Sequence, residues 1–216
     1  MQALAELEQG GPPKSVAAYA RDRLSEHLWA VGRSEAALSA LPELPTPADN
    51  LTLWQSWHRN LLQRLGPGHP DTLTTRGNVA DWTGRAGDAR GALELFTALL
   101  PDHQRVLGPD HTGTLTTRNN IADWTGHAGD ARGALELFTA LLPDQQRVLG
   151  PDHPKTLTTR GNIARWTGQA GDARGALELF TALLPDQQRV LGPDHPDVQA
   201  TQARIEQLTS NLRDDE

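Results

Sequence analysis

Apolar residues recur at three- and four-residue steps along much of the chain, which is the spacing of one face of an α-helix. The clearest stripe holds Leu93, Phe96, Leu99 and Leu100. The same stripe returns twice, around Phe138 and around Phe180, with polar and small residues between the copies. The pattern predicts an all-α chain built from a repeated pair of helices.

The repeated unit occupies residues 70–111, 112–153 and 154–195. In the first copy the pattern predicts one helix over 72–86 and a second over 88–107. Gly87 separates the two helices, and the Asp88 carboxylate is placed to cap the second one. Gly108 and Pro109 end it. A fixed period of this size is typical of arrays in which each unit buries its apolar face on the next.

Two features of the second helix run against local helix preferences. Pro101 recurs as Pro143 and Pro185, and a proline inside a helix costs about 3 kcal/mol. We therefore expect a kink or a short break just before Pro101, which then starts a last helical piece. Gly84 and Gly91 each cost about 1 kcal/mol relative to alanine, and we expect close approach of neighbouring helices to compensate.

The flanking segments predict caps for the array. Residues 1–13 are expected to be disordered, and 14–69 to form a helical N-terminal cap or degenerate repeat. Helices are expected over 15–31, 34–41 and 48–65, with a loop at 42–47. Trp54 precedes Phe96 by one full repeat, so the third of these helices takes the place of a second helix. Residues 196–216 are expected to form a C-terminal capping helix whose last three residues fray.

The unit resembles a tetratricopeptide repeat of the long type seen in kinesin light chains and in many actinobacterial regulatory proteins. The matching residues are Ala80, Gly87, Ala92 and Phe96, together with the connector at residues 147–157. The unit departs from the pattern at Thr83, where an aromatic residue is usual, and at the proline of the second helix. The resemblance implies a right-handed α-solenoid of tandem helix-turn-helix repeats that binds protein or peptide partners.

Composition and charge narrow the function. The formal net charge is −7, which disfavours binding to nucleic acids through their phosphates. The chain has no cysteine, and no apolar run approaches the roughly 20 residues of a membrane span. The N-terminus has neither the charged nor the apolar part of a secretion signal. Together with a composition rich in Arg, Ala, Gly and Leu, these features favour a bacterial, cytoplasmic protein with no membrane contact.

The differences between the copies point to a binding surface. The first two copies differ at six positions and the last two at five. Apart from a Val/Ile exchange, the differences inside the first helix are four residues apart, which places them on one helical face. In the family that the unit resembles, this face lines a concave groove and an adjoining Asn contacts peptides. The expected groove residues are Asn78, Asp81, Arg85, Asn119, Asn120, Asp123, His127, Asn162, Arg165 and Gln169. Neutral drift at exposed positions is the alternative explanation of these differences.

The other recurring residues favour structural roles. One histidine per unit precedes each first helix, and we expect these residues to serve the connector turns rather than a metal ion. Trp82, Trp124 and Trp166 are expected in the core or in packing between units, rather than in stacking on a ligand. Arg76 is expected to pair with an acidic residue of the second helix, such as Glu94.

The sequence thus predicts a non-catalytic scaffold or regulatory module without cofactor or metal, which binds a protein or peptide in its groove. Four alternatives remain open. The first is a self-association module that pairs through exposed repeat edges or through the segment around Trp54 and Trp57. The second is the sensor end of a STAND-type signalling system, because residues 19–38 resemble helices that precede repeats in such ATPases. The third is an enzyme whose site is not visible in the sequence. The fourth is a register-slipped or designed-like array of near-identical copies with no evolved ligand.

Overall fold

The structure is a computed structural model that describes residues 44–214. This part consists of helices joined by short turns and contains no strand. The helices are α4 (Pro47–Leu65), α5 (Pro70–Arg85), α6 (Ala89–Val106), α7 (Thr112–His127), α8 (Ala131–Leu149), α9 (Pro154–Gln169), α10 (Ala173–Leu191) and α11 (Pro196–Asp214). The expected disordered segment 1–13, the expected helices 15–31 and 34–41, and the stretch 19–38 all lie outside the described residues.

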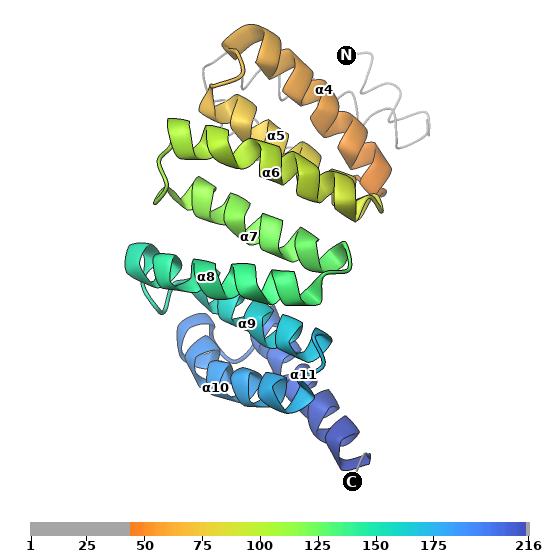
Figure 1. Cartoon of the computed structure of the whole chain (residues 1–216), viewed down its shortest axis with the longest axis vertical. Coiled ribbons are helices and arrows are strands. Elements are labelled where there is room, and N and C mark those ends of the chain that lie inside the picture. The colour runs from red at the N-terminus through yellow and green to blue at the C-terminus, as the bar shows by residue number, and fades with distance from the viewer. Residues whose placement is uncertain (1–43, 215–216) are drawn as a thin grey trace, which may run out of the picture.

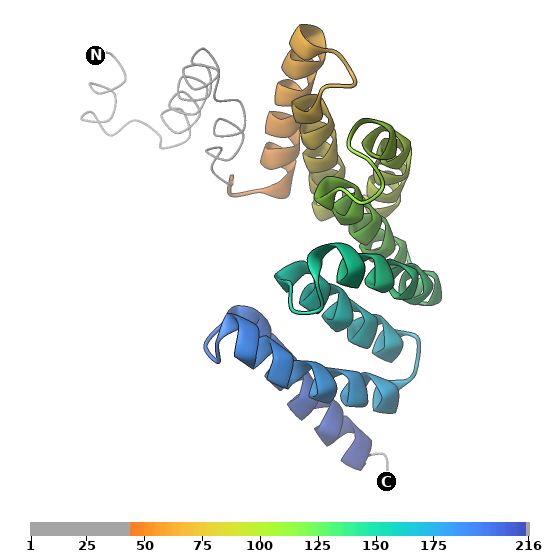
Figure 2. The same cartoon turned by 90° about the vertical axis from the view of Figure 1, so that its left-hand side faces the viewer.

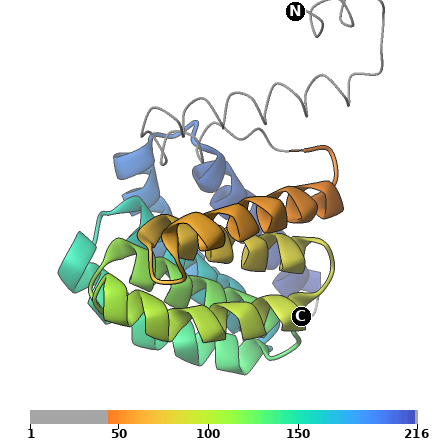
Figure 3. The same ribbon diagram turned by 90° about the horizontal axis from the view of Figure 1, so that it is seen from above.

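Each helix packs against the next one along the chain, and α7 also contacts α5 and α9. The helices form one stack from α4 at one end to α11 at the other (Figure 1). The stack is bowed when it is viewed from the side (Figure 2), and the view from above shows the helices lying over one another (Figure 3). The all-α solenoid expected from the sequence is confirmed.

The first helix of each unit begins at the connector histidine. The Nδ1 atom of His69 accepts from the backbone N–H of Asp71 at 3.2 Å, and His111, His153 and His195 make the same contact two residues on. The histidine thereby satisfies one of the free amides at a helix start. Proline follows at the first helical position of α5 and α9, where its missing N–H costs nothing. The predicted role in the connector turns is confirmed.

The second helix of each unit begins at an aspartate, as predicted. Asp88 caps α6 by accepting from the N–H of Gly91 at 2.8 Å. A Cβ atom at Gly91 would overlap this carboxylate, so the glycine makes room for the cap. The expectation that it permits close helix packing is therefore wrong. Gly87 precedes the cap with φ +107°, a left-handed conformation that glycine adopts without strain.

The expected break at the proline of the second helix does not occur. α6 continues through Pro101, and α8 and α10 continue through Pro143 and Pro185. All three prolines are exposed, so their rings lie on the outer side of the helix and not against a neighbouring helix. The packed residues on the other side, such as Phe96 and Leu99, hold the helix together at this position.

The first and second helices of each unit are joined by an ion pair. Arg76 of α5 donates to Asp102 of α6 at 2.6 Å, and the same pair recurs at 2.7 and 2.8 Å in the next two units. Asp102 is therefore the partner, and the prediction of Glu94 is wrong. Arg76 also donates to the carbonyl of Ala98, 3.3 Å away, in the turn that the proline interrupts.

The α4 helix begins one residue earlier than expected. Pro47 is its first residue rather than part of the preceding loop, and the Thr46 hydroxyl caps it by accepting from the N–H of Asp49 at 3.1 Å. Leu61 is fully buried, while Trp54 is half-buried and Trp57 is likewise only partly exposed on the same helix. At the other end, α11 buries Val198 completely.

Candidate peptide-binding surface

The candidate surface follows the first helices α5, α7 and α9. On α5, Asp81 follows Asn78 by three residues and Arg85 follows Asp81 by four, so the three side chains share one helical face. The same spacing recurs on α7 and α9. Asn78 and Asp81 are half-buried on α5 and Arg85 is exposed at its end. The equivalent residues of α7 and α9 have the same exposure: Asn120, Asp123, Asn162 and Arg165 are half-buried, and His127 and Gln169 are exposed.

The three Asn side chains have free hydrogen-bonding capacity. The Nδ2 atom of Asn78 donates to the Thr74 carbonyl of its own helix at 3.1 Å. Within residues 44–214, the amides of Asn120 and Asn162 make no hydrogen bond. An amide offers a donor and an acceptor together, which is what the backbone of an extended chain requires.

The charged positions of the surface are engaged with one another. Arg85 lies 2.7 Å from Asp81 on the same helix. Between units, Arg165 of α9 forms an ion pair with Asp123 of α7. His127 also approaches that carboxylate, with its Nε2 atom 3.6 Å away. The structure thus brings Asp123, His127 and Arg165 into one cluster across the α7–α9 contact.

Asn119 belongs to the contact between helices. Its Oδ1 atom accepts from the Thr159 hydroxyl of α9 at 3.3 Å. Gly77 and Gly161 stand at the same position in the other two units. Asn119 is half-buried and also lines a small opening of about 110 Å³ beside α7 and α9.

Asp81, the first acidic residue of the candidate surface, has a raised pKa. Burial raises the pKa of the Asp81 carboxyl group, Arg85 opposes this shift, and the negative charge of Asp123 adds to it. The step from α5 to α7 therefore places two acids near each other, whereas the step from α7 to α9 places an acid beside a base.

The recurring tryptophans of α7 and α9 pack between units, as predicted. The ring of Trp124 covers Gly84 of the preceding unit, and the ring of Trp166 covers Gly126. His127 lies between the two rings, with centroid distances of 5.3 Å to Trp124 and 5.5 Å to Trp166. This close approach explains the glycine near the end of the first helix.

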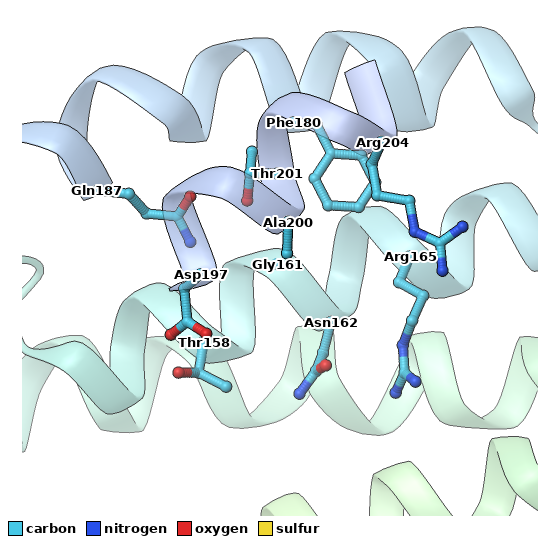
Figure 4. Close-up of a pocket in the computed structure, with 10 residues that line it drawn as sticks. All are labelled: Thr158, Gly161, Asn162, Arg165, Phe180, Gln187, Asp197, Ala200, Thr201 and Arg204. Carbon is cyan, nitrogen blue, oxygen red and sulfur yellow. The ribbon is translucent and has the colours of Figure 1, made fainter. Parts of the chain in front are cut away.

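Two openings follow the contact between α9 and α11. The first, of about 200 Å³, is lined by residues of α9, α10 and α11, among them Asn162, Phe180 and Thr201 (Figure 4). The second, of about 190 Å³, also touches Phe180 and adds Gly168 and Leu208. Figure 4 shows Arg165 pointing away from α11, toward the preceding unit where Asp123 lies.

The sequence reasoning missed one polar position of the second helices. His103, Gln145 and Gln187 are equivalent residues, and all three are buried. His103 bonds the Thr117 hydroxyl through Nδ1 at 2.7 Å. The Oε1 atoms of Gln145 and Gln187 have no partner, and both residues line openings of the surface. The exchange of His103 for Gln145 is one of the six differences between the first two copies, so the signal was available.

The acidic residues beside the connector histidines take part in ion pairs within the protein. Asp110 and Asp152 each precede a connector histidine. Asp110 forms a bidentate ion pair with Arg147 of α8, and Asp152 forms one with Arg189 of α10. Among residues 44–214, no three His, Asp or Glu side chains gather as a metal site would require. In the same part of the chain, no helix is both long and apolar enough to span a membrane.

The comparisons with known proteins agree on one family. Two tetratricopeptide repeat family models match residues 72–113 and 126–188. No curated protein matches the chain. Among solved structures, BtubC (BKLC) from P. vanneervenii is 18% identical, with a TM-score of 0.74, over 93% of this chain and 83% of that chain. A putative kinesin light chain of Podosopora anserina with nearly identical TPR-like repeats is 20% identical, with a TM-score of 0.60, over 89% and 85% of the two chains. A point variant of that protein is equally similar, at 20% identity and a TM-score of 0.61 over 89% and 84%.

Proposed function

Because this chain belongs to the tetratricopeptide repeat proteins, we propose that it is a non-catalytic scaffold or regulatory module that binds a protein or peptide segment along α5, α7 and α9. We place this activity in the bacterial cytoplasm. Repeats of this family generally mediate contacts between proteins, and the solved structures with this fold include kinesin-light-chain-like proteins.

One observation carries the proposal: the ladder of Asn78, Asn120 and Asn162 offers amide groups that the protein itself leaves largely unused. Asn120 and Asn162 have no hydrogen bond within the described residues, and Asn78 uses only one donor, on its own helix. A segment in extended conformation presents one C=O and one N–H per residue. Each Asn can therefore donate Nδ2–H to a ligand carbonyl and accept a ligand N–H at Oδ1.

The spacing of the ladder sets the length of the ligand. Arg165 of α9 pairs directly with Asp123 of α7, so neighbouring first helices stand about one helix spacing apart, roughly 8–10 Å. An extended chain advances about 3.3 Å per residue, so about three ligand residues separate neighbouring Asn contacts. A segment that reaches all three amides is therefore about seven residues long.

The varying positions supply selectivity. Asp81 and Arg85 lie beside the first Asn, Asp123 and His127 beside the second, and Arg165 and Gln169 beside the third. Since Asp123 and Arg165 already pair with each other, a charged ligand side chain at this point must compete with that pair. Burial raises the pKa of Asp81, so a ligand cation beside it would favour the ionised carboxylate.

The proposal is tested by capture from the source lysate. The full chain is used as bait beside a variant in which Asn78, Asn120 and Asn162 are all changed to Ala. The matched control changes Gln104, Gln146 and Gln188 to Ala, which removes the same number of amides from the second helices. Circular dichroism of each variant establishes that its helices are intact.

The account predicts a partner that the wild type and the Gln variant capture and the Asn variant loses. A partner that all three baits capture equally would contradict the assignment of the site. If no partner appears and the purified chain has a concentration-dependent mass above that of the monomer, self-association replaces the proposed function.

A further inference from the structure

Two contacts between consecutive first helices are closed by an indole ring. Trp124 of α7 covers Gly84 of α5, and Trp166 of α9 covers Gly126 of α7. A Cβ atom at either glycine would overlap the ring, so the fit leaves no free space. Trp166 is 6% exposed, and the contact is therefore nearly dry.

The third contact, between α9 and α11, lacks this ring. Leu208 stands one full repeat after Trp166 and takes its place. A Cβ atom at Gly168 would meet only Ala176, with its Cβ 3.2 Å away. An opening of about 190 Å³ remains, lined by Gly168, Leu208, Ala176 and Phe180. Phe180 is 6% exposed, whereas the equivalent Phe138 is fully buried.

Polar side chains also line the contact between α9 and α11. The neighbouring opening shares Phe180 and is lined by Asn162, whose amide has no hydrogen bond within residues 44–214. It is also lined by Gln187, which is 4% exposed and whose Oε1 atom has no partner. A ligand backbone at this opening can use the amide of Asn162, whereas the Oε1 atom of Gln187 is buried out of its reach.

We infer that the α9–α11 opening binds an aromatic side chain of the partner, which takes the place of the indole that closes the two preceding contacts. This inference rests on the proposed function and names the side chain that the surface selects. The ring lies against Gly168, Phe180 and Leu208, while the ligand backbone reaches Asn162. Arg204 lines both openings, so the segment around the ring is neutral or acidic rather than basic.

The test uses N-acetyl-tryptophanamide as a probe that stands in for a tryptophan of a peptide ligand. Its binding to the full chain is monitored by backbone amide NMR. Binding of one side chain is expected in the millimolar range, with shifts at Gly168, Phe180 and Leu208. N-acetyl-leucinamide should bind several-fold more weakly. The variant Leu208→Trp places the chain's own indole in the opening and should abolish the shifts. Leu208→Phe serves as a second plug if the first variant does not fold.

The matched control is Ser210→Trp, which adds an indole on an exposed part of the same helix and should leave probe binding unchanged. The inference is overturned if the wild type shows no shifts at these residues, if Leu208→Trp retains them, or if the leucine probe binds equally well. The probe experiment needs no natural partner, so its failure leaves the capture experiment untouched. Conversely, probe binding at Gly168 and Leu208 would persist even if the capture experiment found no partner.

Discussion

The guanidinium group of Arg165 forms an ion pair with the carboxylate of Asp123, which stands at the same position one unit earlier. At the preceding step, the same two positions hold Asp81 and Asp123, both acidic. Nearly identical units therefore meet through different charges. The contact between α7 and α9 therefore joins opposite charges. At the contact between α5 and α7, the charge of Asp81 is instead balanced within α5 by Arg85, 2.7 Å away.

Charge reversal tests the coupling between these two residues. Arg165→Asp should lower the free energy of unfolding by about 1 kcal/mol, because it removes the pair and places two carboxylates together. The double variant Asp123→Arg/Arg165→Asp should recover most of the loss, as measured by urea unfolding. Arg90→Asp, on an exposed site of α6, is the control and should change little. A loss in the double variant that equals the summed losses of Asp123→Arg and Arg165→Asp would show that the two residues are not coupled.

The contact between Gly126 and Trp166 makes one helix glycine irreplaceable. Gly126→Ala should destabilise the chain by about 1–2 kcal/mol in urea unfolding, because the new methyl overlaps a buried ring. Gly77→Ala is the matched control in a first-helix interior. Its Cβ would lie 3.7 Å from Leu99, an ordinary contact, so the helix preference of alanine should stabilise the chain by up to about 1 kcal/mol. A stabilised Gly126→Ala would contradict the packing described.

The prolines of the second helices should lower stability. Pro143 lies inside a continuous helix and is exposed, so Pro143→Ala restores a backbone hydrogen bond without disturbing a packed contact. The variant should raise the free energy of unfolding by about 1–3 kcal/mol, which thermal and urea unfolding both measure. A loss of stability would mean that the neighbouring helices require a bend at this position.

Acid should destabilise the N-terminal cap and the first unit through the half-buried His58 and the buried His103. Burial lowers the pKa of His103, and the nearby charges of Arg76 and His111 lower it further, while Asp102 opposes them. The folded state therefore favours the neutral ring, so this contribution is fully present above the unfolded pKa of about 6.5 and is lost as the pH falls below it. His58, with its pKa also lowered mainly by burial, adds to the effect.

His103→Gln reproduces the residue of the next two units and isolates this contribution. The variant should lose less stability than the wild type when the pH is lowered from above to below the unfolded pKa of histidine, as urea unfolding at both values measures. His153→Gln, in a connector turn outside the buried region, is the control. An unchanged pH dependence in His103→Gln would contradict the assignment.

The sequence predicts much of this fold because its periodicity and its capping residues act locally. Asp88 and the connector histidines stand next to the helices that they cap, so their roles follow from position alone. The break at Pro101 was predicted wrongly because the stabilising contacts of Phe96 and Leu99 come from other helices. The partner of Arg76 was missed for a related reason, since the crossing of two helices decides whether Glu94 or Asp102 is within reach.

The candidate surface was predictable as a face but not in its detail. Four-residue spacing places the varying positions together, whichever way the helices pack. The engagement of Asp123 with Arg165, and of Asn119 with Thr159, depends on how far one unit is shifted against the next. The opening at Leu208 required the observation that α11 continues the pattern of first helices without their tryptophan.

The most direct measurement places a photo-crosslinking residue, p-benzoylphenylalanine, at Asn120 or, in a separate variant, at Gln146, and exposes each full chain to the source lysate. The account predicts that irradiation joins a partner to the chain substituted at Asn120 on α7 and not to the chain substituted at Gln146 on α8. Crosslinking at Gln146 alone would contradict the claim that partners bind along the first helices.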